Sequence, residues 1–460
     1  MTGTDSSATP LTPNQRLLAT GLVLGVTLVA FETTAAITAL PTIADELGGD
    51  SLYGVALAAY TLANLVALVA GGQFADRRGP TPTFLIAVAT FVTGLLVAGF
   101  APSMEVIVIG RVLQGAGSGG FAPIAYVLVK RAFPADRQAM MYALLSAGWV
   151  LPSLVAPAFG GVVTEQFGWR WVFFGIVPLA VAVGAMASIP MRRFGPTSAG
   201  GRPARDSGER RVLVAFGAAA GVATAVVSLT SANMTILVVG AVAGATLAVA
   251  MLRRLLPSGT FTARAGQPAV VACRFLATAA FIGVDGFVPL AADRVHGASP
   301  TRQGFVIIGA AVTWTAGQAL SAKRPGAAPQ RVVRLGFAFL MLGVVLVAPV
   351  LIADWPLWAT FIGWSVGGFG MGVLFNPTTV SAMSYAADGN EGDVSSQVQL
   401  ADALGFSLMG GLGGATVAFA DRGSIALQTA LVANFTMAVL LAFAGIIASR
   451  GVRSAGTTTV

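Results

Sequence analysis

This chain is poor in charged residues, thiols and imidazoles. Only 10% of its 460 residues are charged, and it contains one cysteine, Cys273, and one histidine, His296. A single cysteine excludes an internal disulfide, and one cysteine with one histidine argues against a metal cluster. We therefore expect no metal site and no cofactor. His296 lies beside charged Asp293 and Arg294, which indicates a helix end rather than a proton path.

Lysine is nearly absent as well. The two lysines, Lys130 and Lys323, are each followed by Arg, and neither follows Gly. The chain therefore lacks the G-x-x-x-x-G-K-[ST] loop that cradles nucleotide phosphates, and we expect an ion gradient rather than ATP as the energy source. The loops also lack a nucleophile elbow and a spaced catalytic pair. The sequence predicts no catalytic residues and a protein that is not an enzyme.

Apolar residues, in contrast, are abundant. They make up 55% of the chain, and the mean hydropathy is +0.80. A membrane-spanning helix needs roughly 20 apolar residues, so the chain has room for fourteen such helices with short loops. The sequence predicts an all-α integral membrane protein with 14 transmembrane helices at about 17–41, 52–73, 83–101, 105–129, 138–163, 170–190, 212–230, 235–255, 268–291, 303–321, 332–352, 357–380, 396–419 and 424–448.

Positive charge alternates from loop to loop. Of the 27 Lys and Arg residues all but two are Arg, which indicates a GC-rich bacterial genome. They gather in every second loop, at 77–78, 130–137, 192–211, 253–264, 323–334 and 450–453. This bias marks the cytoplasmic side, so we expect a multi-pass protein of the cell membrane with both termini in the cytoplasm. The net charge of +8 then reflects topology and not nucleic-acid binding.

A polar stretch from Met191 to Arg211, rich in Gly, Pro, Ser and Arg, divides the predicted helices into six and eight. The first two of the eight are built from Ala, Val, Gly and Leu and are joined by a very short turn, which suggests a lipid-facing hairpin. We predict an N-terminal six-helix bundle at 1–190, a cytoplasmic linker at 191–211, an inserted two-helix hairpin at 212–255 and a C-terminal six-helix bundle at 256–460. Two such halves suit a transporter with a central site.

Four ionisable side chains inside the apolar segments point to function: Glu32, Arg111, Asp285 and Asp402. A charge at bilayer depth is costly, and the charges that persist there usually face a cavity, pair with each other and mark a transport path. Structural ion pairs are the alternative. At about 1.5 Å per residue, Glu32 lies about 10–14 Å and Arg111 about 9 Å inside the outer ends of their helices, so the two can share a level. Asp285 also lies about 9 Å inside, and Asp402 lies nearer the cytoplasm.

One loop motif resembles the signature of the major facilitator superfamily. Between the second and third predicted helices, Gly72, Asp76, Arg77 and Gly79 match G-x-x-x-D-R-x-G. The resemblance implies a major facilitator fold and a cytoplasmic gate at these four residues. In that gate, Asp76 would lie against the positive N-terminus of the helix that begins near Ser395. The further basic residues that usually end the signature are missing here.

Other motifs are similar to those of the fourteen-helix drug:proton antiporters within that superfamily. Arg111 and Gln114 lie in an R-x-x-Q-G-x-G segment, and Pro157, Gly160 and Gly161 lie in a partial match to the exporter motif G-P-x-x-G-G. Further similar segments lie at 31–41, 169–178, 289–304 and 368–377, so the resemblance runs from about residue 17 to residue 448. The proline and paired glycines would kink the fifth helix and pack it closely, which implies a part in gating.

The resemblance implies a secondary active transporter that exports amphipathic, cationic or zwitterionic small molecules in exchange for protons. Its expected proton-coupling residues are Glu32, Arg111, Asp285 and Asp402, and its expected substrate-binding residues are Glu32, Arg111, Gln114, Asp285 and Asn376. Competition between a proton and a cationic substrate for Glu32 would couple their movements. For Asp402, a proton exit and a structural pair both remain open.

The expected partners are a small-molecule substrate, protons and membrane lipids, with no nucleic acid, and we expect a monomer. Two other functions remain open. One is a dedicated exporter of a single metabolite or lipid, which a substrate panel would distinguish from a multidrug exporter. The other is a membrane scaffold or sensor without transport, which would be unaffected by Glu32→Gln.

Overall fold

The computed structural model describes residues 10–48, 52–195, 205–229, 231, 233–298, 300–323, 328–388 and 390–455, and these ranges contain helices but no strand. The first group is α1 (Pro13–Leu47), α2 (Tyr53–Arg78), α3 (Pro80–Gly99), α4 (Met104–Ala132), α5 (Ala135–Ala147), α6 (Val150–Phe167), α7 (Arg170–Phe174) and α8 (Ile176–Met191). A pair follows, α9 (Arg205–Leu229) and α10 (Met234–Leu255). The second group is α11 (Gln267–Asp285), α12 (Val288–His296), α13 (Pro300–Ala322), α14 (Pro329–Val347), α15 (Leu357–Ser384), α16 (Glu391–Asp421) and α17 (Leu427–Ala448). The predicted all-α class is confirmed for the described residues.

Twelve helical stretches of the described chain are long and apolar enough to cross a membrane. The predicted spans 138–163 and 303–321 are not among these twelve. The first corresponds to α5 and α6, which are separated by Gly148 and Trp149, and the second corresponds to α13. Each of the fourteen predicted segments is thus mostly helical in its described part, and twelve candidate spans are found among the described residues.

Two prolines explain where predicted spans are interrupted. Pro152 has no amide hydrogen to donate to the carbonyl of Gly148, and the break between α5 and α6 lies at that point. In the same way Pro289 cannot donate to the carbonyl of Asp285, and α11 ends at Asp285 before α12 begins. The span predicted at 268–291 therefore consists of two helices, which together form one candidate span, Gln267–His296. Asp285 lies at this interruption and not within a continuous helix.

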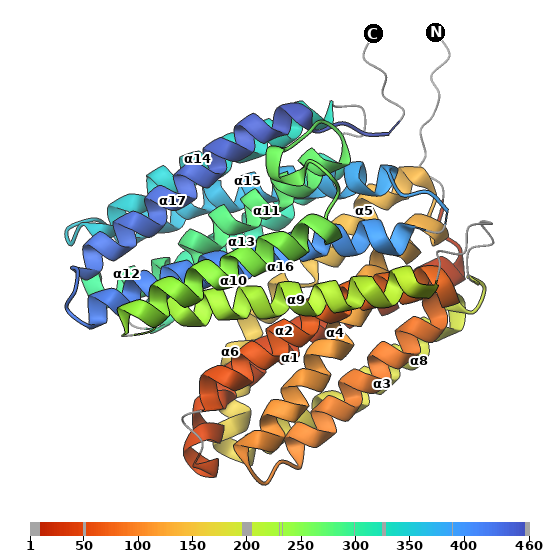
Figure 1. Ribbon diagram of the computed structural model, residues 1–460, viewed down its shortest axis with the longest axis horizontal. Coiled ribbons are helices and arrows are strands. Elements are labelled where there is room, and N and C mark those ends of the chain that lie inside the picture. Colours follow the sequence, from red (N-terminus) through yellow and green to blue (C-terminus); the bar gives the residue numbers. More distant parts are fainter. Residues whose placement is uncertain are drawn as a thin grey trace.

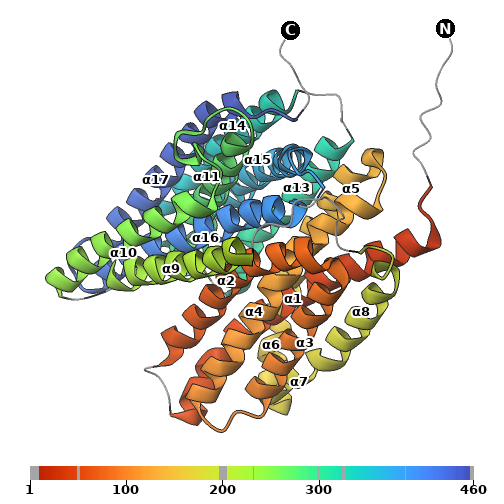
Figure 2. The ribbon, with the colours of Figure 1, turned by 45° about the vertical axis from the view of Figure 1, so that its right-hand side comes forward.

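The helices form two bundles with α9 and α10 beside them (Figure 1). In the first bundle α4 packs against α2 and α3, and α1 packs against α6 and α8. In the second, α15 packs against α13 and α14, and α11 packs against α16 and α17. The bundles are joined by contacts of α16 with α2 and α4, and of α5 with α13 and α15. Their ribbons are closest around α5 and diverge towards α6 and α12 (Figures 1 and 2).

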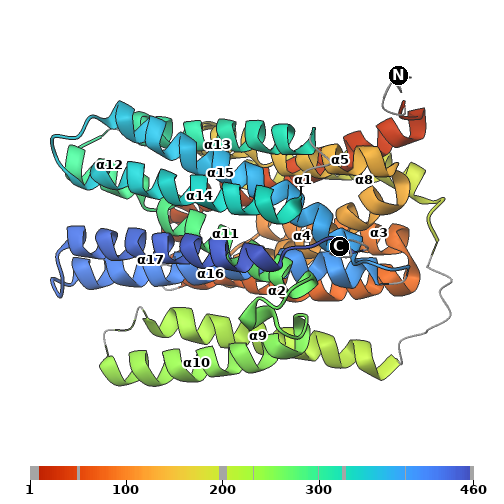
Figure 3. The same cartoon turned by 90° about the horizontal axis from the view of Figure 1, so that it is seen from above.

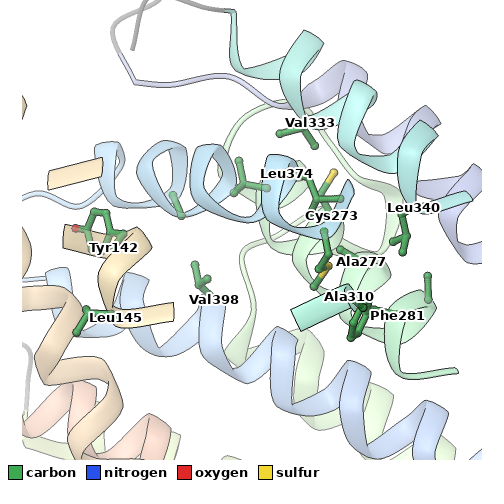
Figure 4. Close-up of a cluster of buried hydrophobic side chains, with 14 of the residues drawn as sticks. Tyr142, Leu145, Cys273, Ala277, Phe281, Ala310, Val333, Leu340, Leu374 and Val398 are labelled. Atoms are coloured by element: carbon green, nitrogen blue, oxygen red, sulfur yellow. The ribbon is translucent and has the colours of Figure 1, made fainter. Parts of the chain in front are cut away.

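Apolar packing explains why the bundles meet at one end. A large buried cluster includes Tyr142 and Leu145 of α5 together with Val398 of α16 and residues of α11, α13, α14 and α15 (Figure 4). A second cluster, which includes Leu40, Phe91, Ile107 and Phe173, contains residues of the first bundle only. Burial of apolar side chains therefore holds the two bundles together around α5 and α16.

The pair formed by α9 and α10 lies along one flank of the molecule (Figure 3). The two helices pack on each other, and α9 also contacts α2 and α16. In α10 only 17% of the most apolar stretch is buried, the smallest share among the twelve candidate spans. This exposure suits a helix with its apolar surface towards lipid. The predicted linker at 191–211 overlaps the start of a helix, since α8 ends at Met191 and α9 begins at Arg205. Residues 196–204 lie outside the described ranges.

Local sequence signals position the first helix. Thr12 caps α1, because its hydroxyl accepts a hydrogen bond from the Gln15 amide at 3.3 Å while the Gln15 side chain accepts one from the Thr12 amide at 2.9 Å. Gln15 Nε2 also donates to the carbonyl of Ala132 at the end of α4, at 2.7 Å. Gly48 ends α1 with φ of 66°, a conformation that favours glycine. The Gln15 contact thus joins the start of α1 to the end of α4, the helix that carries Arg111.

Candidate functional site

Glu32 of α1 and Arg111 of α4 form a buried ion pair. Arg111 Nη1 lies 2.9 Å from Glu32 Oε1, and the side chains are 2% and 0% exposed. The same Nη1 donates to Gln114 Oε1 at 2.9 Å, one helical turn further along α4. The structure therefore brings three of the residues predicted from sequence into one cluster, which we call the Glu32 cluster. A buried pair of this kind is costly to desolvate and weak evidence for stability, so its presence calls for another explanation.

Tyr60 of α2 completes the Glu32 cluster. The Arg111 guanidinium carbon lies 4.3 Å from the centre of the Tyr60 ring, and the Tyr60 hydroxyl lies 2.8 Å from the Thr33 hydroxyl. The ring face stabilises the buried cation by a cation–π interaction. Two polar atoms of the cluster, Glu32 Oε2 and Gln114 Nε2, are buried without a hydrogen-bond partner among the described residues. An acceptor and a donor are thus available to a proton, a water molecule or a substrate group.

Asp402 of α16 is paired with a residue that was not singled out from the sequence, Arg274 of α11. Arg274 Nε donates to Asp402 Oδ1 at 2.9 Å, and Nη2 contacts Oδ2. Thr278, one turn along α11, donates to Asp402 Oδ1 at 3.1 Å. Arg274 Nη1 donates to the Thr379 hydroxyl of α15 at 2.7 Å. We call these four residues the Asp402 cluster. Its Arg274–Asp402 contact is bidentate, which is a strong type of ion pair.

An aromatic row connects the Asp402 cluster with Asp285. The Arg274 guanidinium carbon lies 3.4 Å from the centre of the Phe375 ring. From Phe375 the row continues to Trp314 at 5.4 Å, Phe281 at 5.1 Å and Trp364 at 5.0 Å between ring centres. The Trp364 indole N–H donates to Asp285 Oδ1 at 2.7 Å. Asp285 is therefore held by Trp364, and neither Glu32 nor Arg111 is a hydrogen-bond partner of Asp285 among the described residues.

Asn376 lies on α15 and is 3% exposed. Its Oδ1 atom is buried without a hydrogen-bond partner in the described part of the chain. Of the five predicted substrate-binding residues, Glu32, Arg111 and Gln114 are in direct contact, whereas Asp285 and Asn376 belong to the second bundle. The structure thus places these five residues in two groups and does not join them by direct contacts.

The predicted gate residue Asp76 contacts the N-terminus of α16. Asp76 Oδ1 accepts from the Gly392 amide at 2.8 Å, and Oδ2 accepts from the Asp393 amide at 3.0 Å. We call this contact the latch, and the end of the molecule where it lies the latch end. The partner helix is the expected one, although it begins at Glu391 and so starts earlier than Ser395. A carboxylate placed there satisfies helix amides that have no partner in their own helix.

Two glycines of the motif have steric reasons to be glycine. A Cβ on Gly72 would collide with the backbone of Gly392 and lie 3.0 Å from Ser396 Cβ, so glycine lets α2 and α16 touch. Gly79 has φ of 89° in the turn between α2 and α3. Arg77 makes no hydrogen bond or ion pair with a residue that the structure describes. The motif therefore combines one polar contact, one close approach and one turn.

Further contacts close the latch end. Arg131 of α4 pairs with Glu391 of α16 through two contacts, of 2.7 and 3.0 Å. Lys130 Nζ donates to the carbonyl of Met383 at 2.9 Å and also contacts the carbonyl of Ala386. These bonds join α4 of the first bundle to the end of α15 and the start of α16. The two bundles are thus connected by both polar and apolar contacts at this end.

The paired glycines of α6 differ from each other. A Cβ on Gly160 would lie 3.1 Å from the Ala35 backbone of α1, whereas a Cβ on Gly161 would meet nothing within 4 Å. Gly160 therefore allows α6 to approach α1 closely, near the Phe31–Phe159 ring contact of 5.1 Å. The side chain of Pro157 lies outside the described residues. No group of three or more His, Cys, Asp or Glu side chains in the described ranges is placed to hold a metal ion.

Some residues of these clusters carry a signal in the sequence and others do not. Arg274 is a further ionisable residue inside the predicted span 268–291, and its charge in an apolar segment is a signal that should have singled it out. Tyr60, Thr278 and Trp364 carry no such signal, because Tyr, Thr and Trp are ordinary in membrane helices. Their contacts depend on helix packing that the sequence alone does not reveal.

Comparisons with known proteins identify the family of this chain. A Major Facilitator Superfamily sequence profile matches residues 22–410. The chain is 31% identical, over 94% of both chains, to a protein named "Probable multidrug-efflux transporter" in Mycobacterium tuberculosis strain H37Rv. It is also 31% identical to the multidrug export protein EmrB of Haemophilus influenzae, over 36% of this chain and 33% of that one.

A solved structure supports the same fold. The human organic anion transporter MFSD10 (TETRAN) superposes with a TM-score of 0.70 at 15% identity, covering 95% of this chain and 100% of that chain. At this identity the likeness concerns the fold alone. The profile match and the bacterial relatives, together with the many apolar helices, show a multi-pass membrane protein, and the chain belongs to the major facilitator superfamily.

Proposed function

We propose that this protein is a secondary active transporter that exports amphipathic, cationic or zwitterionic small molecules in exchange for protons. The observation that carries the proposal is the fully buried Glu32–Arg111 pair, in which one carboxylate oxygen has no partner among the described residues. Relatives named as multidrug-efflux transporters support the export of small molecules. The match to such a relative covers 94% of each chain, so the two proteins are similar in length.

The chemistry of the Glu32 cluster suits proton exchange. When Glu32 is charged, Arg111 neutralises it and the Tyr60 ring supports the cation. A proton on Oε2 would weaken the pair, and a cationic substrate near Oε2 would compete for the same negative charge. Because the Glu32 and Arg111 side chains are buried, each of these events changes the electrostatic energy strongly. Gln114 Nε2, also without a partner among the described residues, would then donate to an oxygen of the substrate.

Asp285 and Asp402 are the second candidates for proton coupling. Asp285 accepts a hydrogen bond from Trp364 and forms no ion pair with another described residue, so it is the better candidate for a second proton or a substrate charge. Asp402 is engaged by Arg274 and Thr278, which favours the structural pair over the proton exit. Asn376 would add an acceptor from α15 to the substrate site.

The topology proposed from the sequence fits these helices. The pair α5–α6 and helix α13 would add two spans to the twelve candidates, which gives fourteen. The boundaries 1–190, 191–211, 212–255 and 256–460 then divide the chain into a bundle, a linker, an inserted hairpin and a second bundle. With both termini in the cytoplasm, the latch end is cytoplasmic, and lipid surrounds a monomer.

Gating follows from the latch. With the bundles joined at the latch end and diverging at the other, this conformation would open outward (Figure 2). Opening inward would require Asp76 to leave the N-terminus of α16. Gly72, Asp76, Arg77 and Gly79 then act at one gate, while Pro157, Gly160 and Gly161 let α6 move against α1.

Transport of a lipophilic cation into inverted membrane vesicles tests this proposal. Vesicles with an imposed proton gradient should accumulate tetraphenylphosphonium, and an uncoupler should abolish the accumulation. Glu32→Gln should abolish it as well, whereas Glu46→Gln, which changes an exposed carboxylate on the same helix, should not. Accumulation that survives the uncoupler would contradict proton exchange. Loss of accumulation in both variants would mean that Glu32 has no special part.

A further inference from the structure

The pair α9–α10 touches both bundles at once. One buried apolar cluster combines α2, α9, α10 and α16, and its members are Leu65, Val66, Val69, Ala215, Ala218, Ala219, Ala248, Leu252, Leu255, Leu400 and Leu404. Leu65, Val66 and Val69 belong to the first bundle, whereas Leu400 and Leu404 belong to the second. The pair therefore packs across the line along which α2 and α16 meet.

A polar contact extends this packing to the latch. Arg211 of α9 pairs with Asp393 of α16, with Nη2 2.6 Å from Oδ1 and Nη1 3.1 Å from Oδ2. The Arg211 guanidinium also donates to the carbonyl of Leu255, the last residue of α10, at 3.3 Å. The Arg211 side chain near the start of α9 thus contacts both the end of α10 and the first turn of α16.

Asp393 has three partners, which lie on α2, α9 and α16. Its backbone amide donates to Asp76 Oδ2 at 3.0 Å, while its carboxylate receives Arg211. Gln397 Nε2, one turn further along α16, also donates to Asp393 Oδ2 at 3.0 Å. Arg211, which fixes the Asp393 side chain, therefore also helps to position the Asp393 amide that donates to Asp76. The geometry couples α9 to the latch through a single residue.

These contacts exist together only when α2 and α16 are adjacent. Separation of the two helices would break the Asp76 latch, and α9 would have to leave either α2 or α16. A contact present in one conformation and lost in the other shifts the equilibrium towards the first. The α9–α10 pair is therefore placed to stabilise the conformation that is closed at the latch end.

We infer that Arg211 is a positioning residue of the gate: through Asp393 it makes the α9–α10 pair a third element that holds the latch end closed. The inference rests on the proposed transport by alternating access. It assigns α9 and α10 a part in setting the balance of conformations, in addition to their contact with lipid. Arg211 touches neither substrate nor the Glu32 cluster, so its effect should appear in the balance of states and not in substrate affinity for the closed form.

Distances between two spin labels test this inference in the full-length protein. Ala135 at the start of α5 and Lys323 after α13 are exposed, lie in different bundles and are remote in sequence from the latch residues, so cysteines there would report separation at this end. Cys273 is buried, so it is shielded from labelling. Arg211→Gln should raise the ratio of long to short distances about fivefold, the effect of losing a partly exposed ion pair. Arg210→Gln removes the same charge from the exposed neighbouring position and should leave the ratio unchanged.

A double variant separates the pair from a general charge effect. Asp393→Asn should raise the ratio as Arg211→Gln does, and the two changes together should do no more than either alone. Arg211→Lys, which keeps the charge, should restore part of the closed population. Equal effects of Arg211→Gln and Arg210→Gln, or no effect of Arg211→Gln, would overturn the inference. If Asp76→Asn still opens the latch end in that last case, the transport proposal stands; if Asp76→Asn also has no effect, the proposed gate itself is wrong.

Discussion

The Asp76 carboxylate of α2 lies 2.8 Å from the backbone amide of Gly392 in α16, although 316 residues separate them in the chain. The same carboxylate receives the Asp393 amide at 3.0 Å. Both amides belong to the first turn of α16, where the helix dipole favours a negative charge. One side chain of the first bundle thus caps a helix of the second.

Asp76→Asn should shift the protein towards the form that is open at the latch end. Asn keeps one acceptor but turns an amide donor towards a helix N-terminus, so at least one charge-assisted hydrogen bond is lost. Such bonds contribute about 1.5–3 kcal/mol, and the ratio of open to closed forms should rise about tenfold or more. The Ala135–Lys323 label pair measures that ratio. Arg77→Gln, in the same motif, should change it little, and an equal shift in both variants would contradict the assigned role of the Asp76 carboxylate.

Gly160→Leu and Gly161→Leu should differ although the positions are adjacent. At Gly160 the new side chain meets the α1 backbone at Ala35, whereas at Gly161 it meets open space. Overpacking of this kind costs about 1–3 kcal/mol, so Gly160→Leu should lower the melting temperature in detergent and Gly161→Leu should not. Equal melting temperatures of the two variants would show that α6 does not depend on this close approach.

Arg274→Gln should destabilise the protein by leaving the Asp402 carboxylate without its guanidinium. Breaking a buried pair on one side costs about 3–5 kcal/mol. Adding Asp402→Asn should recover much of the lost thermal stability, because the unpaired charge is then removed. We expect the double variant to transport tetraphenylphosphonium in vesicles, since the hydrogen bonds of the Asp402 cluster favour a structural role for this ion pair. A stable double variant that does not transport would instead make Asp402 part of the proton path.

Tyr60→Phe and Tyr60→Leu separate the two contacts of the Tyr60 side chain. Phe keeps the ring beneath Arg111 and loses only the hydroxyl contact with Thr33, whereas Leu loses both. A desolvated cation–π interaction contributes about 2 kcal/mol, so Leu should lower thermal stability clearly more than Phe. The melting temperatures of the two variants provide the measurement, and equal losses would show that the ring face does not support Arg111.

Much of the helical organisation could be predicted from hydrophobic runs and charge. The pairing of Glu32 with Arg111 also followed from sequence, because two costly charges at a similar depth are expected to find each other. The breaks after Ala147 and Asp285 were not predicted, since both lie inside continuous apolar runs. Each break lies at a carbonyl that has no amide donor because a proline follows four residues later: Gly148 before Pro152, and Asp285 before Pro289. Both prolines are visible in the sequence.

The contacts between distant helices could not be predicted in the same way. Arg274 and Asp402 are 128 residues apart, and neither helix periodicity nor charge identifies them as partners. The link from Arg211 to Asp393 spans 182 residues and depends on how α9 lies across α2 and α16. Such pairs follow from the packing of one bundle against the other, which a single sequence does not specify.

Proton release from the detergent-solubilised protein on adding tetraphenylphosphonium tests the central claim most directly. If the cation and a proton compete for Glu32, the native protein should release protons in a saturable way and Glu32→Gln should release none. Glu46→Gln should behave as the native protein does. Equal release from the native protein and Glu32→Gln, or no release from either, would contradict cation exchange for protons at Glu32.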